Sequence, residues 1–417
     1  MERNKILIVS YKLGTKHGVG GRRWLYYGLG LLKRGHDVFF LTYEAELPAE
    51  LKDYKDRVVF LKTNYPKVLK SQPKSLINKL LYRFWVFILS RLNNGAIFDE
   101  AVRTKQQFID KASQLIIQKK IQYVLISGAP FSLLHFGTLL KKRFPQITLI
   151  SDYRDAWTQG IGYGIQQLPS QKFQNELNNE KEVLMISDKI FVASNDIGNS
   201  LNEIVDDIKP IAISNFIDNS HFANDVLNTF KTEEKESNTI TISHIGSVNK
   251  GLQKYWIHFL KNINEVHKTG IFKIKCQFIG CQNKELKEYA QSNDFEFVYF
   301  LPNMDVKEFG KYLLNSDMLV FFKHDDFPNS FPTKFFDYVL FKKPLLCYSV
   351  KGDVTEEIIS NTIGTIFDEN VSYENFLKTI MGYKNGSLKF NDNYDWSKFS
   401  LENCISRIED TLHLKKN

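Results

Sequence analysis

The sequence predicts an α/β protein built from two doubly wound, Rossmann-like domains. Three observations predict this fold class. Short strand patterns alternate with longer helix patterns, as in parallel sheets covered by helices. The alternation occurs in two series separated by a polar stretch. The 417 residues of the chain are enough for two full domains. We expect the two domains to face each other across a cleft.

The first series begins with the β-branched strand pattern Lys5–Ser10. A loop follows, and a helix pattern then runs from about Arg22 to Arg34, where Gly35 marks its end. The further strands predicted in this series are Asp37–Thr42, Tyr123–Ser127, Ile147–Ser151 and Lys189–Ala193.

The second series repeats this architecture. Its predicted strands are Thr239–His244, Lys275–Ile279, Glu296–Phe300, Met318–Phe322 and Pro344–Tyr348. We therefore expect an N-terminal domain at 1–218, a polar linker at 219–238, a C-terminal domain at 239–390 and a final segment at 391–417. The final segment contains the amphipathic pattern Leu401–Leu414, which predicts a helix that packs back toward the N-terminal domain.

Composition and charge limit the classes of partner. Hydrophobic residues make up 43% of the chain and charged residues 24%, which is ordinary for a soluble globular protein. The formal net charge of +8 favours an anionic partner: a phosphorylated ligand, an acidic membrane surface or a nucleic acid. Because the basic residues are spread along the chain without a recognisable nucleic-acid module, we expect no nucleic-acid partner.

The N-terminus and the cysteines indicate the compartment. The first apolar run is too short for a signal peptide and fits a first strand instead. The four cysteines show neither metal spacing nor a disulfide pattern, and the cluster His324-Asp325-Asp326 has no identifiable distant ligand. We therefore expect a cytoplasmic protein without a metal site.

One segment, Pro66 to Leu92, departs from the alternation. It combines apolar and aromatic residues with a basic set: Lys67, Lys70, Lys74, Lys79, Arg83 and Arg91. Its apolar stretch is too short to span a bilayer. Such a helix can lie in the interface of an anionic membrane leaflet. The alternative is a helix of the protein core whose basic residues face solvent.

Two turns of the first series contain candidate ligand-binding residues of the cleft. Both follow a strand and precede a helix, and open α/β sheets bind ligands at the carboxyl ends of their strands. Glycines there let backbone amides approach a phosphate or a sugar. The alternative for each is a purely structural turn. The candidate residues are Gly18, Gly20, Gly21, Ser127, Gly128 and Pro130.

Three charged residues, Asp152, Arg154 and Asp155, end the next apolar run. Charges at such a position are costly unless they are paired or used. Arg154 either pairs with a carboxylate and holds the loop in place, or helps to orient an acceptor substrate or a leaving diphosphate group. We take Arg154 and Asp155 as candidate catalytic residues and Asp152 as a candidate cleft residue.

The second series contains a more specific pattern. PTKFFDYVLFKKPLL places Lys334 and Asp337 one helical turn apart near a helix start. A lysine at a helix N-terminus favours a diphosphate, and a carboxylate one turn later can accept hydrogen bonds from ribose hydroxyls. Gly246 can bring the backbone close to a ligand, and Lys250 is either a phosphate partner or a solvated loop lysine. The combination predicts a nucleotide-sugar site.

These segments resemble bacterial glycosyltransferases of family 4, which have the GT-B fold. The resemblance is carried by GVGGRRW with KRGHDV, by the pair SGAPFS and DYRDAWT, by ISNFID and by PTKFFDYVLFKKPLL. It covers nearly the whole chain, and the SGAPFS and DYRDAWT pair is similar to a subgroup that builds surface polysaccharides. The last segment is similar to the donor motif of the family.

The resemblance implies a retaining glycosyltransferase of lipopolysaccharide or capsule biosynthesis. Such an enzyme transfers a sugar from a nucleotide diphosphate sugar to a glycan or lipid-linked glycan at the cytoplasmic membrane face. No cofactor and no bound metal are implied. In the family two glutamates eight positions apart contact the donor, and these positions are Asn329 and Asp337 here. Ser247 stands where many members have an arginine. The implied donor-binding residues are Gly246, Ser247, Lys250, Asn329, Ser330, Thr333, Lys334 and Asp337.

Two other functions remain open. A nucleotide-sugar epimerase of the same architecture would also bind a nucleotide sugar, although the basic aromatic segment at 66–92 weighs against it. A non-catalytic partner subunit would keep the fold and lose donor binding, which Asn329 and Ser247 make conceivable.

Overall fold

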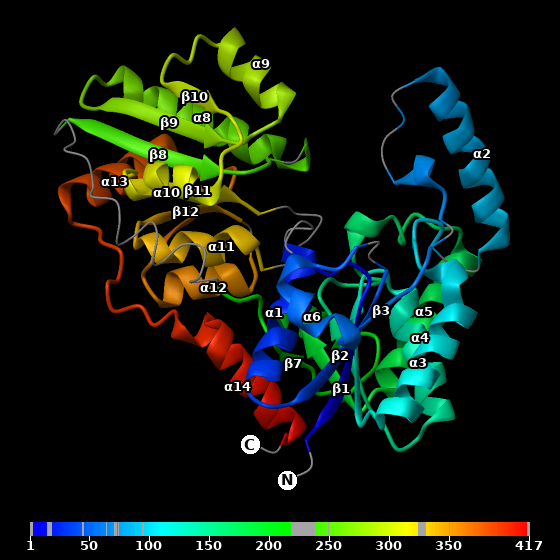
Figure 1. The fold of residues 1–417 in the computed structure, drawn as a ribbon. Helices are drawn as coiled ribbons and strands as arrows, with labels where there is room; N and C mark the ends of the chain where they lie inside the picture. The colour runs from blue at the N-terminus through cyan, green and yellow to red at the C-terminus, as the bar shows by residue number, and fades with distance from the viewer. Residues whose placement is uncertain are drawn as a thin grey trace. The chain divides into compact units, whose positions relative to one another are not determined.

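The chain divides into two compact units. The computed structural model describes residues 3–14, 19–43, 46–63, 65–70, 73, 75–93, 96–217, 238–248, 250–323, 331–349 and 351–414. Unit 1 consists of Met1–Asn215 together with Leu401–Asn417, and unit 2 consists of Phe216–Ser400. Each unit contains a parallel sheet with helices on both faces (Figure 1).

The sheet of unit 1 has seven strands in the order β3-β2-β1-β4-β5-β6-β7. Its strands are β1 (Lys5–Ser10), β2 (Asp37–Thr42), β3 (Val58–Phe60), β4 (Tyr123–Gly128), β5 (Thr148–Tyr153), β6 (Lys189–Val192) and β7 (Ile211–Ala212). Its helices are α1 (Val19–Lys33), α2 (Leu76–Leu92), α3 (Lys105–Lys119), α4 (Ser132–Arg143), α5 (Ser170–Ile186), α6 (Asn195–Asn202) and α14 (Leu401–Leu412). The central strands β1, β4 and β5 are buried over five of their six residues, as expected for parallel strands covered on both faces.

The sheet of unit 2 has six strands in the order β10-β9-β8-β11-β12-β13. Its strands are β8 (Thr239–Ile245), β9 (Lys273–Ile279), β10 (Val298–Leu301), β11 (Met318–Phe322), β12 (Leu345–Tyr348) and β13 (Gly364–Phe367). Its helices are α8 (Gln253–Lys268), α9 (Lys284–Ser292), α10 (Val306–Leu314), α11 (Thr333–Tyr338), α12 (Asp353–Ser360) and α13 (Tyr373–Asn385). In both units the first strand pairs with the fourth strand in chain order: β1 with β4, and β8 with β11. This is the doubly wound order.

The predicted α/β class is confirmed in both units. The predicted strands are present and shift by at most two residues at their ends, whereas β3, β7 and β13 were not predicted. The helix that contains Lys334 and Asp337, α11, is short. It ends at Tyr338 and continues as a 3₁₀ turn at Val339–Phe341, where Lys342 takes a left-handed conformation with φ 49°.

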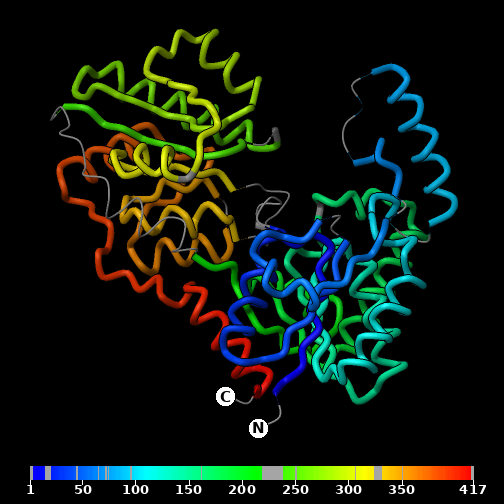
Figure 2. The backbone as a smooth tube through the Cα atoms, viewed as in Figure 1, coloured from blue at the N-terminus to red at the C-terminus, as the bar shows by residue number. Residues whose placement is uncertain are grey.

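Helix α2 is not a core helix, so that alternative is wrong. Leu89 is its one buried residue, and Leu76, Ile77 and Leu80 are 66–79% exposed. Ser75 caps the helix by accepting a hydrogen bond from the backbone nitrogen of Asn78. The helix projects from the body of its unit (Figures 1 and 2). Within the described parts of the chain, no helix is both long and apolar enough to cross a bilayer.

Helix α14 joins the end of the chain to unit 1. It packs against α1, where a Cβ on Gly30 would lie only 2.0 Å from Cδ1 of Ile405. Glu409 of α14 is buried and accepts hydrogen bonds from Nη1 of Arg34 at 2.6 Å and from Nε2 of His36 at 2.8 Å. Close packing and buried charge pairing therefore hold this terminal helix in place.

Candidate functional site

In unit 2 a polar cluster lies at the carboxyl ends of β8 and β11. Gly246 and Ser247 follow β8, and α11 follows β11 along the chain. The two strands are neighbours, and the strand order of the sheet reverses between them. Ligands of open α/β sheets bind at such a switch point.

Lys334 is the cation of this cluster. Its Nζ donates a hydrogen bond to the backbone oxygen of Ser247 at 2.8 Å and lies 3.4 Å from Nε2 of His244. Nδ1 of the buried His244 lies 2.8 Å from the carbonyl oxygen of Val320, so we assign the ring proton to Nδ1. That assignment leaves Nε2 as an acceptor that faces the ammonium group of Lys334.

The environment of the cluster disfavours positive charge. Burial lowers the pKa of His244 well below its ordinary value, and the adjacent Lys334 lowers it further, so the imidazole is neutral. Burial also lowers the pKa of Lys334 to about 8, although Cys281 and Asp337 oppose that shift. An anion beside Nζ would restore the favoured charged state of the lysine, which suits this cluster to a phosphate group.

The backbone around Lys334 is fixed by Gly246 and Tyr338. Gly246 has φ +74°, and its nitrogen donates to the oxygen of Ile279 at 2.7 Å. A side chain is strained at this φ, and a Cβ would lie 3.5 Å from Cε of Lys334. The buried hydroxyl of Tyr338 accepts from the nitrogen of Ile245 at 2.9 Å and donates to the oxygen of Val320 at 3.3 Å. Tyr338 thereby ties α11 to the ends of β8 and β11, a role that the sequence did not indicate.

The structure brings together only part of the predicted donor set. Gly246, Ser247 and Lys334 meet, Thr333 is the first residue of α11, and Asp337 interacts electrostatically with Lys334. Lys250 begins a short 3₁₀ helix, Lys250–Leu252, but its side chain lies outside the described residues. Asn329 and Ser330 also lie outside the described residues, as does the cluster His324-Asp325-Asp326.

In unit 1, Asp152 is the centre of a buried network. The side chain has no exposed surface and accepts hydrogen bonds from Nη2 of Arg23 at 3.0 Å, from Nε1 of Trp24 at 2.6 Å and from Oγ of Ser127 at 2.8 Å. Arg23 also donates to the backbone oxygens of Ile213 and Ser214. Ser127 and Asp152 therefore contact each other. Their hydrogen-bond network connects α1, β4 and β5 with Ile213 and Ser214, near the end of the first chain segment of unit 1. The sequence did not single out Arg23, although its place among apolar residues of an amphipathic helix was a usable signal.

Arg154 and Asp155 lie nearer the surface. Nε of Arg154 donates to Oδ2 of Asp155 at 3.0 Å, and the hydroxyl of Tyr163 donates to the same oxygen at 2.6 Å. The two charged side chains are 23% and 26% exposed. This is the geometry of the loop-bracing ion pair, and a catalytic role for the pair stays a prediction.

The glycine turn after β1 contacts Arg154. A Cβ on Gly20 would lie 2.5 Å from Nη1 of Arg154, so the guanidinium packs directly on the glycine backbone. The oxygen of Gly21 accepts a hydrogen bond from the nitrogen of Gly14 at 3.1 Å. Gly18 lies outside the described residues. In the second turn Gly128 packs against Phe131 and Leu134, and the oxygen of Pro130 accepts from the nitrogen of Leu133.

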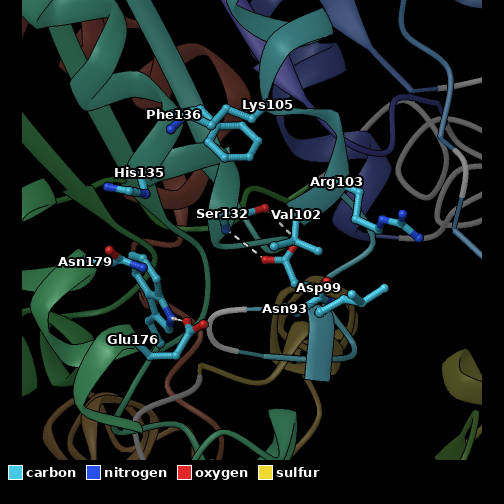
Figure 3. Close-up of a pocket in the computed structure, with 12 residues that line it drawn as sticks. Asn93, Asp99, Val102, Arg103, Lys105, Ser132, His135, Phe136, Glu176 and Asn179 are labelled. Atoms are coloured by element: carbon cyan, nitrogen blue, oxygen red, sulfur yellow. Dashed lines mark hydrogen bonds between the residues drawn. The ribbon is translucent and has the colours of Figure 1, made fainter. Parts of the chain in front are cut away.

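Unit 1 also contains a pocket of about 610 Å³ that the sequence did not indicate (Figure 3). Its walls come from the end of α2, the segment before α3, the first turns of α4 and one face of α5. Because these segments are far apart in the sequence, no local motif marks the pocket. Across the described parts of the chain, no group of three or more His, Cys, Asp or Glu side chains is placed to hold a metal ion.

Comparison with known proteins identifies the fold. No family model and no curated protein matches the sequence. The structure is similar to sucrose-phosphate synthase from Thermosynechococcus elongatus, with a TM-score of 0.66 and 11% identity over 99% of this chain and 98% of that one. It is similar to the lipopolysaccharide outer core galactosyltransferase WaaB, with a TM-score of 0.63 and 9% identity over 98% and 99% of the two chains. It also matches Anabaena HepE in complex with UDP, with a TM-score of 0.60 and 11% identity over 98% and 99%.

A second class of enzyme shares this architecture. A UDP-N-acetylglucosamine 2-epimerase covers 100% of this chain and 98% of its own, with a TM-score of 0.54 and 14% identity. Identities this low report the fold and not the reaction. The chain therefore has the GT-B fold, with two doubly wound α/β domains.

Proposed function

We propose that the chain is a retaining glycosyltransferase of family 4 that binds a nucleotide diphosphate sugar in unit 2. The observation that carries this proposal is the cluster of Lys334, Ser247 and His244 at the switch point of the sheet. A partly dehydrated lysine there gains most from a diphosphate. The shared fold with the galactosyltransferase WaaB and with HepE, which holds UDP, supports the same reading.

The roles of Lys334, Gly246, Ser247, Thr333 and Asp337 are supported by their placement, and those of Lys250, Asn329 and Ser330 rest on the resemblance to family 4 alone. Lys334 and the Gly246 loop stabilise the departing diphosphate, with Ser247, Thr333 and Lys250 as further donor contacts. Asp337 holds the ribose, and Asn329 with Ser330 contacts the transferred sugar. We propose that transfer at this site uses no cofactor and no bound metal.

On the other side of the reaction, we assign the acceptor to unit 1. The turns at Gly20–Gly21 and Ser127–Pro130 and the pair Arg154 and Asp155 belong to this side. The acceptor is a glycan or a lipid-linked glycan of cell-surface polysaccharide biosynthesis. Retention places the attack on the face from which the diphosphate leaves.

A turnover screen across nucleotide sugars tests the donor assignment. Asp337→Ala is expected to lower kcat/KM for the best donor roughly tenfold to a hundredfold, since it removes a hydrogen bond to a charged group. Asp392→Ala, an exposed carboxylate elsewhere in unit 2, is the matched control and should leave turnover unchanged. Unchanged turnover in Asp337→Ala would show that this carboxylate does not bind the donor.

The second candidate is a nucleotide-sugar epimerase, which the match to UDP-N-acetylglucosamine 2-epimerase favours. The same screen separates the two reactions, because an epimerase converts the sugar without any acceptor. A third candidate, a non-catalytic partner subunit, predicts that no nucleotide sugar binds or turns over.

We further propose that α2 rests on the inner face of an anionic membrane. Its exposed apolar residues include Leu80, Leu81, Phe84 and Phe87, and exposed basic residues such as Lys79 and Arg83 accompany them. Apolar area with adjacent positive charge is the combination that binds an anionic interface. Replacing Leu80 and Phe84 with serine should abolish co-sedimentation with phosphatidylglycerol vesicles. Ile117→Ser, which changes an equally exposed apolar residue on α3, should not.

A further inference from the structure

We propose that the pocket at the base of α2 binds the neutral sugar headgroup of a membrane glycolipid. The inference rests on the proposed function, because it names the acceptor class that unit 1 would take.

The pocket lies where the exposed face of α2 ends. Leu92 and Asn93, at the C-terminal end of the helix, line it, and Leu92 is 63% exposed. From Leu76 to Phe87 the exposed apolar residues of α2 lie at helical spacing and share one broad face, and Leu92 follows at the end of the helix that lines the pocket. A molecule with an apolar tail and a polar head would place its tail along this face and its head in the pocket.

The volume of about 610 Å³ is within the range of small-ligand sites and is sufficient for one or two sugar rings. Figure 3 shows His135, Asn179 and Glu176 along one side and Asp99 with Val102 opposite, with Ser132 between them. The wall therefore presents polar groups from several directions, with apolar atoms between them.

Two carboxylates give the pocket its acceptors. Asp99 accepts hydrogen bonds from the nitrogen and the hydroxyl of Ser132 at 2.8 and 2.6 Å, and Glu176 accepts from Nε1 of Trp157 at 2.7 Å. These contacts fix both side chains, and each carboxylate oxygen can accept more than one hydrogen bond. Burial raises the pKa of Asp99 and of Glu176, and the charge of Asp99 raises the pKa of Glu176 further. Arg103 and Lys105 also line the pocket, but both are exposed to solvent, whereas the two carboxylates belong to its buried part. The buried part of the wall already disfavours its own negative charge and is a poor site for a phosphate.

Amide side chains supply donors. Asn179 on α5 and His135 on α4 line the pocket. Nε2 of the neutral His135 donates to Oε2 of Glu182 at 3.0 Å, which leaves Nδ1 of the ring as a further acceptor. Asn93 is 5% exposed, and its side-chain nitrogen has no hydrogen-bond partner among the residues that the structure describes. Sugar hydroxyl groups both donate and accept, so they match a wall that mixes carboxylates with amides. A neutral headgroup satisfies both kinds of group without adding an anion beside Asp99 and Glu176.

Vesicle binding by the full chain tests the proposal. The vesicles are phosphatidylcholine alone, phosphatidylcholine with a diglycosyl diacylglycerol, and phosphatidylcholine with phosphatidylglycerol. Asn179→Trp fills the pocket, and Asn178→Trp places the same bulk on the preceding residue of α5, which is exposed and does not line the pocket. We expect the wild-type chain and Asn178→Trp to bind glycolipid vesicles roughly tenfold more tightly than plain vesicles, and Asn179→Trp to lose this preference.

Binding to phosphatidylglycerol vesicles should be the same in all three proteins, because it depends on α2. If Asn179→Trp lowers the Tm, Asn179→Ala adds no bulk and should still weaken glycolipid binding roughly threefold to tenfold. The proposal is overturned if glycolipid adds nothing over phosphatidylcholine, or if both tryptophan variants lose the preference equally. A soluble disaccharide that binds as tightly as the vesicles would overturn the lipid part.

A nucleotide titration of the same proteins keeps the two proposals separate. Asn179→Trp should bind nucleoside diphosphates as the wild-type chain does, because Asn179 belongs to unit 1. If the wild-type chain binds no nucleoside diphosphate, the donor site is refuted and the glycolipid preference still stands. Loss of the glycolipid preference alone would refute the pocket and leave the donor site standing.

Discussion

Asp152 and Asp155 are three residues apart and have different environments. Asp152 is fully buried and neutralises the equally buried Arg23, whereas Asp155 pairs with a partly exposed Arg154. Removing one partner of a buried pair leaves the other charge buried and unpaired. Asp152→Asn should therefore lower the free energy of unfolding by about 3 kcal/mol or more. Asp155→Asn should cost about 1 kcal/mol or less, because solvent screens the exposed partner. Denaturant titration measures both losses, and equal losses would show that the Asp152 network is not a structural brace.

Lys334 gives the proposed donor site a pH dependence. Burial lowers its pKa from the ordinary 10.5 to about 8. The side chain is therefore charged below pH 8 and loses its charge as the pH rises through that value. A diphosphate binds the charged form, and its own phosphate groups are already ionised above pH 7. Affinity for a nucleoside diphosphate should fall roughly tenfold between pH 7 and pH 9.

Lys334→Met is the control for this pH profile. It should bind more weakly at pH 7 and show little change up to pH 9, because His244 stays neutral throughout. A wild-type profile that is flat, or that rises over this range, would contradict the role given to Lys334. Calorimetry in buffers of different ionisation enthalpy adds a second readout, since binding near pH 8 should take up protons.

Among the elements, α14 depends on Glu409. Glu409 is 3% exposed and bonds both Arg34 and His36, whereas Glu402 on the same helix is 77% exposed and bonds Arg34 alone. Glu409→Gln should therefore lower the unfolding free energy of unit 1 by about 2–4 kcal/mol, and Glu402→Gln by less than about 0.5 kcal/mol. Thermal unfolding of the full chain compares the two variants. A larger loss in Glu402→Gln would show that the exposed pair, and not the buried one, holds α14.

The elements also show what the sequence could and could not predict. The long strands were predictable because runs of β-branched and apolar residues are buried on both faces. β3 and β7 have three and two residues, too few to form a pattern, and β13 begins with Gly364 and is half-buried over three of its four residues, so it lacks a buried apolar run. In α2 the apolar pattern cannot distinguish a face packed on a core from one left open, so both alternatives remained until burial was known.

Some residues of the candidate site could be predicted from the sequence and others could not. Lys334 and Gly246 were predictable because local motifs place them after neighbouring parallel strands. Arg23, Tyr338 and the pocket beside Asp99 were not, because their partners are distant in the sequence.

For the whole molecule, the division into units matches the two halves of the proposed reaction. The chain passes from unit 1 to unit 2 at Asn215 and returns at Leu401 to form α14. The proposed donor residues lie in unit 2, and the glycine turns, the charged pair and the pocket lie in unit 1. Each substrate would then be held by a unit with its own core, and donor binding can be measured without any acceptor.

Calorimetric titration of the full chain with nucleoside diphosphates tests the central claim most directly. The account predicts a single site for one of them at pH 7, weakened roughly tenfold or more in Lys334→Met, which removes a charge-assisted contact. Lys342→Gln changes an exposed lysine that follows the 3₁₀ turn after α11, and it should bind as the wild-type chain does. Binding by none of the nucleotides, or equal binding by the wild-type chain and Lys334→Met, would contradict a donor site at the switch point of unit 2.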